Sequence, residues 1–159
     1  MNIVKTLEQY NTNYVYFLDP IKNNIMNDGN FIRIMYSNNI FMLNGIFLLV
    51  NIGNIITEKY YNKIKCIFDV SEYALLIQKI KCVEEDILNK LIVTNKVKKY
   101  KIVEQLTSGS IRIFSDEEYG KSSICSPVKS NNNKFMLKIS GIWETDYEVG
   151  LTYKFIKIT

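Results

Sequence analysis

The chain has 159 residues, a length typical of one domain, and its composition of 47% hydrophobic and 13% aromatic residues excludes a disordered chain. It contains no histidine, so the usual proton carrier of hydrolases and the commonest metal ligand are missing. The three cysteines lie far apart, without the spacing of a zinc site or a disulfide framework, which indicates reduced thiols. The net charge of +4 arises wholly in residues 96–159, which hold eleven basic and seven acidic side chains against nine of each before them.

The N-terminal residues lack the apolar core of a secretory signal. The apolar run at residues 40–56 is shorter than the ~20 residues of a membrane span, and three asparagines and two glycines interrupt it. We therefore expect buried strands in this run, and a soluble, cytoplasmic protein that does not enter a membrane.

The first part of the chain is predicted to form strands. Runs rich in β-branched and aromatic residues stand at 14–18, 31–36, 40–43 and 46–52, and turn-forming dipeptides and tetrapeptides separate them. In the second run, Phe31, Arg33 and Met35 alternate with Ile32, Ile34 and Tyr36, so one face of this strand carries Arg33.

One amphipathic helix is predicted over residues 71–92. Asp69 or Ser71 is available as its N-cap. Apolar residues recur at steps of three or four, which places them on one face of a helix: Leu76, Ile80, Val83, Ile87 and Leu91. The opposite face carries charges of both signs, which is typical of a solvated helix surface.

The remainder is predicted to return to strands. Residues 96–106 and 111–114 form an expected hairpin around Thr-Ser-Gly-Ser, and residues 115–133 an expected mobile polar loop. Clean alternation at 135–140 and 151–156 predicts two antiparallel strands. The predicted elements follow the order of several strands, one helix and a closing set of strands, which is the order expected of an OB-type barrel. We therefore expect a β-rich (α+β) fold in a single domain over 1–159, an OB-like five-stranded antiparallel β-barrel with one amphipathic helix between strands.

Aromatic and basic residues interleaved on strands are the pattern that binds single strands, because bases stack on rings while lysine or arginine contacts phosphates. Three stretches show it: residues 98–101, residues 112–114, and the last strand pair. The alternatives are an edge strand protected by lysines at 98–101, and core roles for Trp143 and Tyr153. The candidate nucleic-acid-binding residues are Arg33, Lys99, Tyr100, Lys101, Arg112, Phe114, Lys138, Trp143, Tyr153 and Lys154.

The closing segment resembles a known family. Lys-Ile-Ser-Gly-Ile-Trp-Glu-Thr at 138–145, followed by Gly-Leu-Thr-Tyr-Lys-Phe at 150–155, is similar to the ending of single-stranded-DNA-binding proteins of large cytoplasmic DNA viruses and virus-like linear plasmids. The resemblance covers about 26 of the 159 residues. It implies an OB-fold that binds single strands during replication. The residues of this chain that match the family's pattern are Gly141, Trp143, Gly150, Tyr153 and Lys154.

The leading hypothesis is therefore sequence-tolerant binding of single-stranded DNA, or of RNA, by stacking and lysine–phosphate contacts. A second hypothesis is a protein-interaction or transcription-accessory subunit of a viral polymerase complex. Replication proteins and further copies of the chain are the protein partners expected. No enzyme activity, cofactor or metal is expected, although acidic residues could in principle bind Mg²⁺: Asp116, Glu117, Glu118, Glu144, Asp146 and Glu148.

Overall fold

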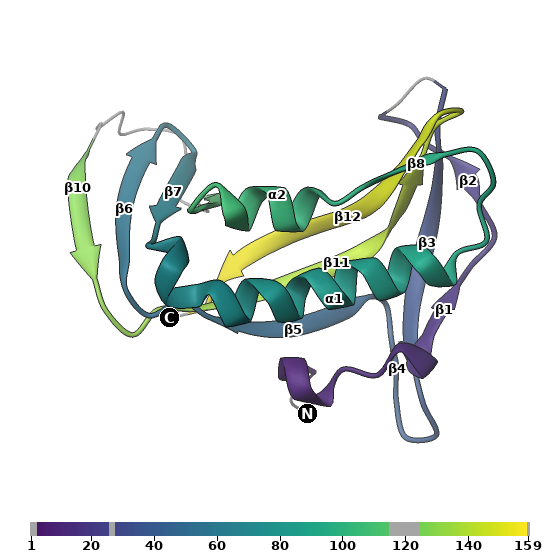
Figure 1. The fold of residues 1–159 in the computed structure, drawn as a ribbon, viewed down its shortest axis with the longest axis horizontal. Helices are drawn as coiled ribbons and strands as arrows, with labels where there is room; N and C mark the ends of the chain where they lie inside the picture. Colours follow the sequence, from purple (N-terminus) through teal and green to yellow (C-terminus); the bar gives the residue numbers. More distant parts are fainter. Residues whose placement is uncertain (1–2, 26–27, 115–124, 159) are drawn as a thin grey trace.

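The computed structural model describes residues 3–25, 28–114 and 125–158 (Figure 1). Two β-sheets enclose the main core together with two α-helices. The strands are β1 (Val15–Phe17), β2 (Ile21–Lys22), β3 (Asn30–Ser37), β4 (Met42–Leu43), β5 (Ile46–Asn51), β6 (Ile55–Tyr60), β7 (Lys63–Ile67), β8 (Val97–Lys99), β9 (Ser110–Phe114), β10 (Cys125–Ser130), β11 (Lys134–Glu144) and β12 (Glu148–Lys157). The helices are α1 (Ala74–Lys90) and α2 (Lys101–Thr107).

The larger sheet is built around the long hairpin of β11 and β12, which confirms the two predicted closing strands. One edge of β11 pairs with β12; the other pairs with β5 at residues 134–139 and with β3 at residues 141–144. The pairing with β12 shifts between Ile139 and Gly141, so Ser140 forms a β-bulge. Strands β1, β2 and β4 pair with β3, and β8 pairs with β12. The sheet curls into an open half-barrel (Figure 1).

The smaller sheet has the order β10-β6-β7-β9 and is antiparallel throughout. Its edge strand β9 lies beside β12 without a hydrogen-bonded ladder between them. The two sheets therefore meet through side chains at this junction.

The predicted central helix is confirmed. The Asp69 carboxylate accepts a hydrogen bond from the backbone N–H of Ser71 at 2.9 Å and caps a 3-10 turn at Val70–Tyr73, from which α1 continues. Ile80, Val83 and Ile87 are buried, as their spacing predicts. No helix in the described ranges combines the length and apolar character needed to cross a membrane, and residues 40–56 form parts of three strands.

The expectation of a single helix is wrong, because residues 101–107 form α2 and the predicted strand at 96–106 ends at Lys99. The carboxylate of Glu84, on α1, accepts hydrogen bonds from the backbone N–H groups of Ile102 and Val103 at 3.1 and 3.0 Å. These are two of the donors that a helix N-terminus leaves unpaired. A cap from a distant residue therefore favours a helix where the local β-branched residues favour a strand.

Three further predictions about the sheets are corrected. The β-rich α+β class is confirmed, but the strands form an open curled sheet and a second four-stranded sheet in place of one five-stranded barrel. The hairpin of 96–106 with 111–114 is also wrong, since β8 pairs in parallel with β12 and β9 pairs with β7. In the predicted loop at 115–133, β10 forms a strand beside β6; residues 115–124 lie outside the described residues.

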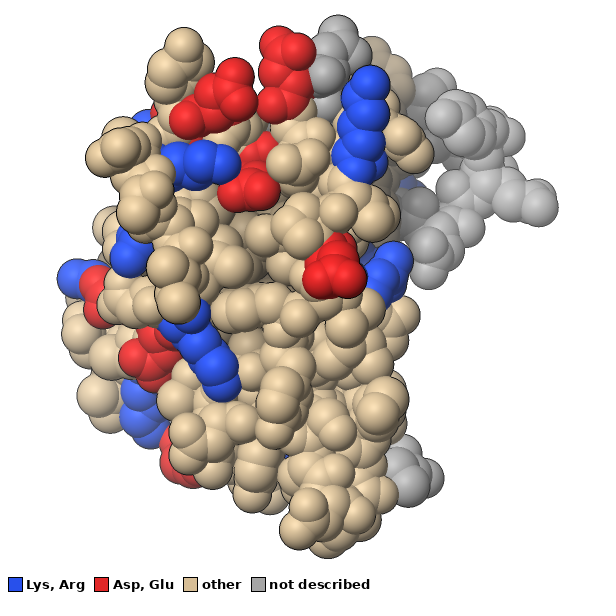
Figure 2. Space-filling view, turned by 90° about the vertical axis from the view of Figure 1, so that its right-hand side faces the viewer, with Lys and Arg blue, Asp and Glu red and all other residues tan. Residues whose placement is uncertain are grey.

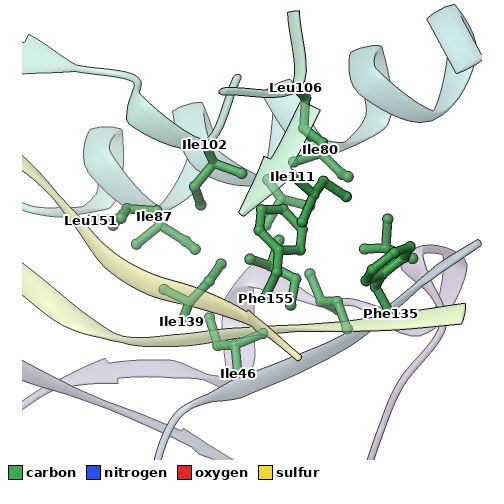
Figure 3. Packing of buried hydrophobic residues seen from close by; sticks show 14 of the residues in the cluster. Ile46, Ile80, Ile87, Ile102, Leu106, Ile111, Phe135, Ile139, Leu151 and Phe155 are labelled. Carbon is green, nitrogen blue, oxygen red and sulfur yellow. The ribbon is translucent and has the colours of Figure 1, made fainter. Parts of the chain in front are cut away.

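The core lies between the helices and the inner face of the larger sheet (Figure 3). Ile80 and Ile87 of α1 and Ile102 of α2 point toward the sheet residues Ile139 and Phe155 (Figure 3). All five side chains are at most 4% exposed. Because the inner face is filled in this way, the opposite face of the larger sheet is the one left to solvent.

Candidate nucleic-acid interface

The outer face of the larger sheet, the side away from α1 and α2, is formed by side chains that alternate with the core residues. On β3, β5, β11 and β12 the inward positions are buried, while the outward ones are partly or largely exposed. The outer-face side chains include Phe31, Arg33 and Met35 on β3, Phe47, Leu49 and Asn51 on β5, Lys134, Met136, Lys138 and Trp143 on β11, and Thr152, Lys154 and Ile156 on β12.

Two aromatic rings of the outer face lie against glycines of the neighbouring strand. A Cβ atom at Gly150 would lie 2.5 Å from Cζ2 of Trp143, and one at Gly141 would lie 2.5 Å from Cζ of Phe31. Only glycine permits so close an approach. Gly141, Trp143 and Gly150, which carry part of the family resemblance, therefore belong to one packed unit in which Trp143 is partly exposed.

The basic residues of this face lie among the rings. The Cζ atom of Arg33 is 5.9 Å from the centre of the Phe31 ring, and Nζ of Lys138 is 5.3 Å from that of Phe47. Arg33 also donates a hydrogen bond to Oδ1 of Asn44 at 3.0 Å. None of the outer-face side chains is a carboxylate.

Lys138 and Lys154 are direct cross-strand partners in the β11–β12 ladder. Like charges placed opposite each other destabilise a sheet pair. No ion pair joins either lysine to an acidic residue of the described ranges. A bound anion would relieve this repulsion, which makes the pair a site suited to a phosphate group.

The predicted basic stretch at 98–101 does not form one strand face. Lys99 makes an ion pair with Glu148 (Nζ to Oε1 3.1 Å), and Lys101, the first residue of α2, makes one with Glu104 (2.8 Å). Tyr100 is partly buried against the core. Because β8 ends at Lys99, these three residues do not share one strand. Both lysines are already ion-paired with acidic neighbours.

Tyr153 lies on the inner side of β12. Its hydroxyl lies within hydrogen-bond distance of two acceptors on α2, Oε1 of Gln105 (2.7 Å) and the backbone oxygen of Lys101 (3.1 Å), and donates its single proton to one of them, which ties α2 to the sheet. Burial raises the pKa of Tyr153 to about 12. Arg112 and Phe114 stand on β9 in the smaller sheet, with exposed side chains. These three residues are apart from the outer face and line a groove together with Lys101 and Lys154.

The structure thus brings Arg33, Lys138, Trp143 and Lys154 together on the outer face. Phe31 and Phe47 were not predicted as contacts. Phe31 lies two positions before Arg33, so strand alternation places both on the same face and could have indicated Phe31 as a contact residue. Phe47 lies in an unbroken apolar run, which carries no signal of exposure.

The positive surplus does not form a patch on every side of the molecule. Figure 2 shows the side over β1, β2 and β3, where basic and acidic side chains are interspersed among uncharged ones. Interspersed charges of both signs largely cancel, so this side does not present a field of one sign to an anionic partner. Individual residues of the outer face, and not the overall charge, would therefore have to attract an anionic ligand.

Within the described residues, no group of three or more Cys, Asp and Glu side chains lies close enough to hold a metal ion. Of the acidic residues considered for Mg²⁺, Glu144 and Glu148 are ion-paired with lysines, and Asp116, Glu117 and Glu118 lie outside the described ranges. Comparison with protein-family models, curated proteins and solved structures finds no match to this chain.

Proposed function

We propose that the outer face binds single-stranded DNA with little sequence preference, in the cytoplasmic replication of a virus or plasmid. The observation that carries this proposal is the interleaving of three rings with three cations on one sheet face without a carboxylate. The rings are Phe31, Phe47 and Trp143, and the cations are Arg33, Lys138 and Lys154.

The chemistry of a single strand matches this face. Its unpaired bases stack on aromatic rings irrespective of sequence, at about 1–3 kcal/mol per base, and its phosphates attract lysine and arginine. Trp143 packs closely against Gly150, so its ring is positioned before a base arrives. Preorganisation of this kind lowers the entropy lost on binding.

The family resemblance of residues 138–155 agrees with this proposal. OB-folds commonly bind oligonucleotides on a strand face of a curled sheet, and here too a curled sheet presents such a face. The fold comparison is an analogy, whereas the outer-face residues are the physical support.

The test is a titration of oligo-dT, oligo-U and duplex DNA at two salt concentrations, with Trp143 fluorescence as the reporter. We expect oligo-dT to quench the fluorescence and to bind more tightly than the duplex. If Arg33, Lys138 and Lys154 each neutralise one phosphate, log K falls with log salt at a slope of about −2. Absence of binding, or binding that salt does not weaken, would contradict the proposal.

A second candidate function is supported by exposed apolar residues at the edge of the same sheet. Six apolar residues are more than 40% exposed around β1, β2 and the β3–β4 hairpin: Tyr16, Leu18, Ile21, Ile25, Ile40 and Met42. Exposed apolar groups that cluster often mark a protein interface. These residues favour a protein partner, in line with an accessory subunit or a homo-oligomer. Because Ile21 pairs with Phe31 and Tyr16 with Met35, part of this surface borders the outer face.

A further inference from the structure

A groove of about 1080 Å³ lies between the second half of β12, α2 and β9. β8 pairs with β12 only as far as Gly150, and beyond this residue the same edge of β12 pairs with no described strand. The groove therefore follows an open strand edge at the junction of the two sheets.

Cations predominate among the described residues that line this groove. They are Lys101, Arg112, Lys154 and Lys157, whereas Glu104 is the sole carboxylate among the described lining residues. Glu104 is already paired with Lys101 at 2.8 Å. Arg112, Lys154 and Lys157 have no ion pair with any described residue, so the groove has a positive charge that an anionic ligand would neutralise.

The groove is continuous with the outer face. Lys154 belongs to both surfaces, since it lies opposite Lys138 on the outer face and also lines the groove. Phe114, at the end of β9, lines the groove with a side chain that is 70% exposed. An exposed ring beside unpaired cations repeats the composition of the outer face.

We infer that a single strand bound on the outer face passes over the edge of β12 at Lys154 and enters this groove. There Arg112 and Lys157 bind its phosphates, and Phe114 stacks on a base. This inference rests on the proposed function and extends the site from one face of the sheet to two connected surfaces.

An extended acidic peptide is the other occupant that an open strand edge suits, because it can add a strand to the sheet. The shared residue Lys154 and the exposed ring of Phe114 favour the nucleic acid. β9 also restricts the space for an added strand, since it already lies beside β12.

The experiment compares oligo-dT of about 5 and about 15 nucleotides, lengths near the ends of the range that one OB-type fold covers. The groove variant is Arg112→Ala/Lys157→Ala, and the control variant is Lys79→Ala/Lys81→Ala on α1, which removes the same charge. Circular dichroism and the urea midpoint verify that each variant is folded. We expect the groove variant to bind the short oligonucleotide as the wild type does.

For the long oligonucleotide, the groove variant should lose at least tenfold in affinity, and its salt slope should become shallower by about 1.4, or ~0.7 for each lost phosphate contact. The control variant should change neither quantity beyond the general effect of charge. Equal losses of affinity for the short and the long oligonucleotide, or no loss for either, would overturn the inference while leaving the proposed function standing.

Binding of neither oligonucleotide by the wild type would overturn both the inference and the proposed function. A groove variant that loses only binding of a poly-glutamate peptide would assign the groove to an acidic protein partner.

Discussion

The indole of Trp143 lies on the backbone of Gly150, and this contact determines what the ring can do. One side of the ring is fixed by the sheet, while the residue as a whole is partly exposed on the outer face. A larger residue at position 150 would displace the ring. The single tryptophan is therefore both a packed residue and a candidate stacking surface.

Trp143→Ala should weaken binding of oligo-dT by about 1–3 kcal/mol, the contribution of one stacked base, and leave the fold intact. Trp143→Phe should recover part of the loss, because it retains a π-face. Fluorescence anisotropy of a labelled oligonucleotide measures the affinity, and urea unfolding tests the fold. If the alanine variant no longer unfolds cooperatively, the ring has mainly a structural role.

Single residues show what the sequence could predict about the site. Lys138 and Lys154 lie on strands whose alternation is clean, so their shared face was predictable. Tyr153 shares the aromatic type of a contact residue, but its hydroxyl binds α2, an element that the sequence did not predict. Residue type and two-residue spacing thus predicted which side chains share a face of a strand. They could not predict which other elements each aromatic ring contacts, because these contacts depend on tertiary structure.

At the scale of elements, α2 depends on a carboxylate from another helix. Glu84 is fully buried and accepts two hydrogen bonds from the first turn of α2. Burial raises the pKa of Glu84, and the two backbone N–H groups counteract this effect in part. Local sequence could not reveal this cap, because the donor and acceptor residues are eighteen or more positions apart. The same reason explains why the parallel pairing of β8 with β12 was missed.

Glu84→Ala should lower the free energy of unfolding by about 2–5 kcal/mol, since the buried N–H group of Ile102 and the part-buried one of Val103 lose their acceptor. Glu84→Gln retains one acceptor oxygen and should cost less. Because the folded pKa is raised, the native carboxyl binds its proton more tightly than the unfolded one, and its contribution to stability falls as pH rises through the range above the ordinary value of 4.5.

The wild type should therefore exceed Glu84→Gln in stability by more at pH 5 than at pH 7, as measured by urea unfolding at both pH values. Glu72→Gln, an exposed residue on the 3-10 turn that precedes the same helix, is the matched control. A difference that is the same at both pH values would show that the buried carboxyl titrates like an ordinary one.

At the scale of the whole molecule, two surfaces of different chemistry share the larger sheet. The outer face carries rings and cations, and the β3–β4 hairpin carries Ile40 and Met42, which are 86% and 72% exposed. Ile40→Ser/Met42→Ser should reduce concentration-dependent association in sedimentation velocity and leave oligo-dT binding unchanged. A variant that loses oligo-dT binding instead would place the nucleic acid near this hairpin.

The bulge at Ser140 determines which side chains of β11 face the core in the second half of the strand. Up to Ile139 the odd-numbered residues face the core, but after the bulge Ile142 faces it and Trp143 faces outward. A strand of strict alternation would turn Trp143 inward, because a slip of one residue exchanges the two faces. One additional backbone unit thus decides whether the same amino acids face the interior or the proposed binding surface. The proposed function of this sheet should consequently be more sensitive to a single-residue deletion near Ser140 than to many substitutions on either side of it.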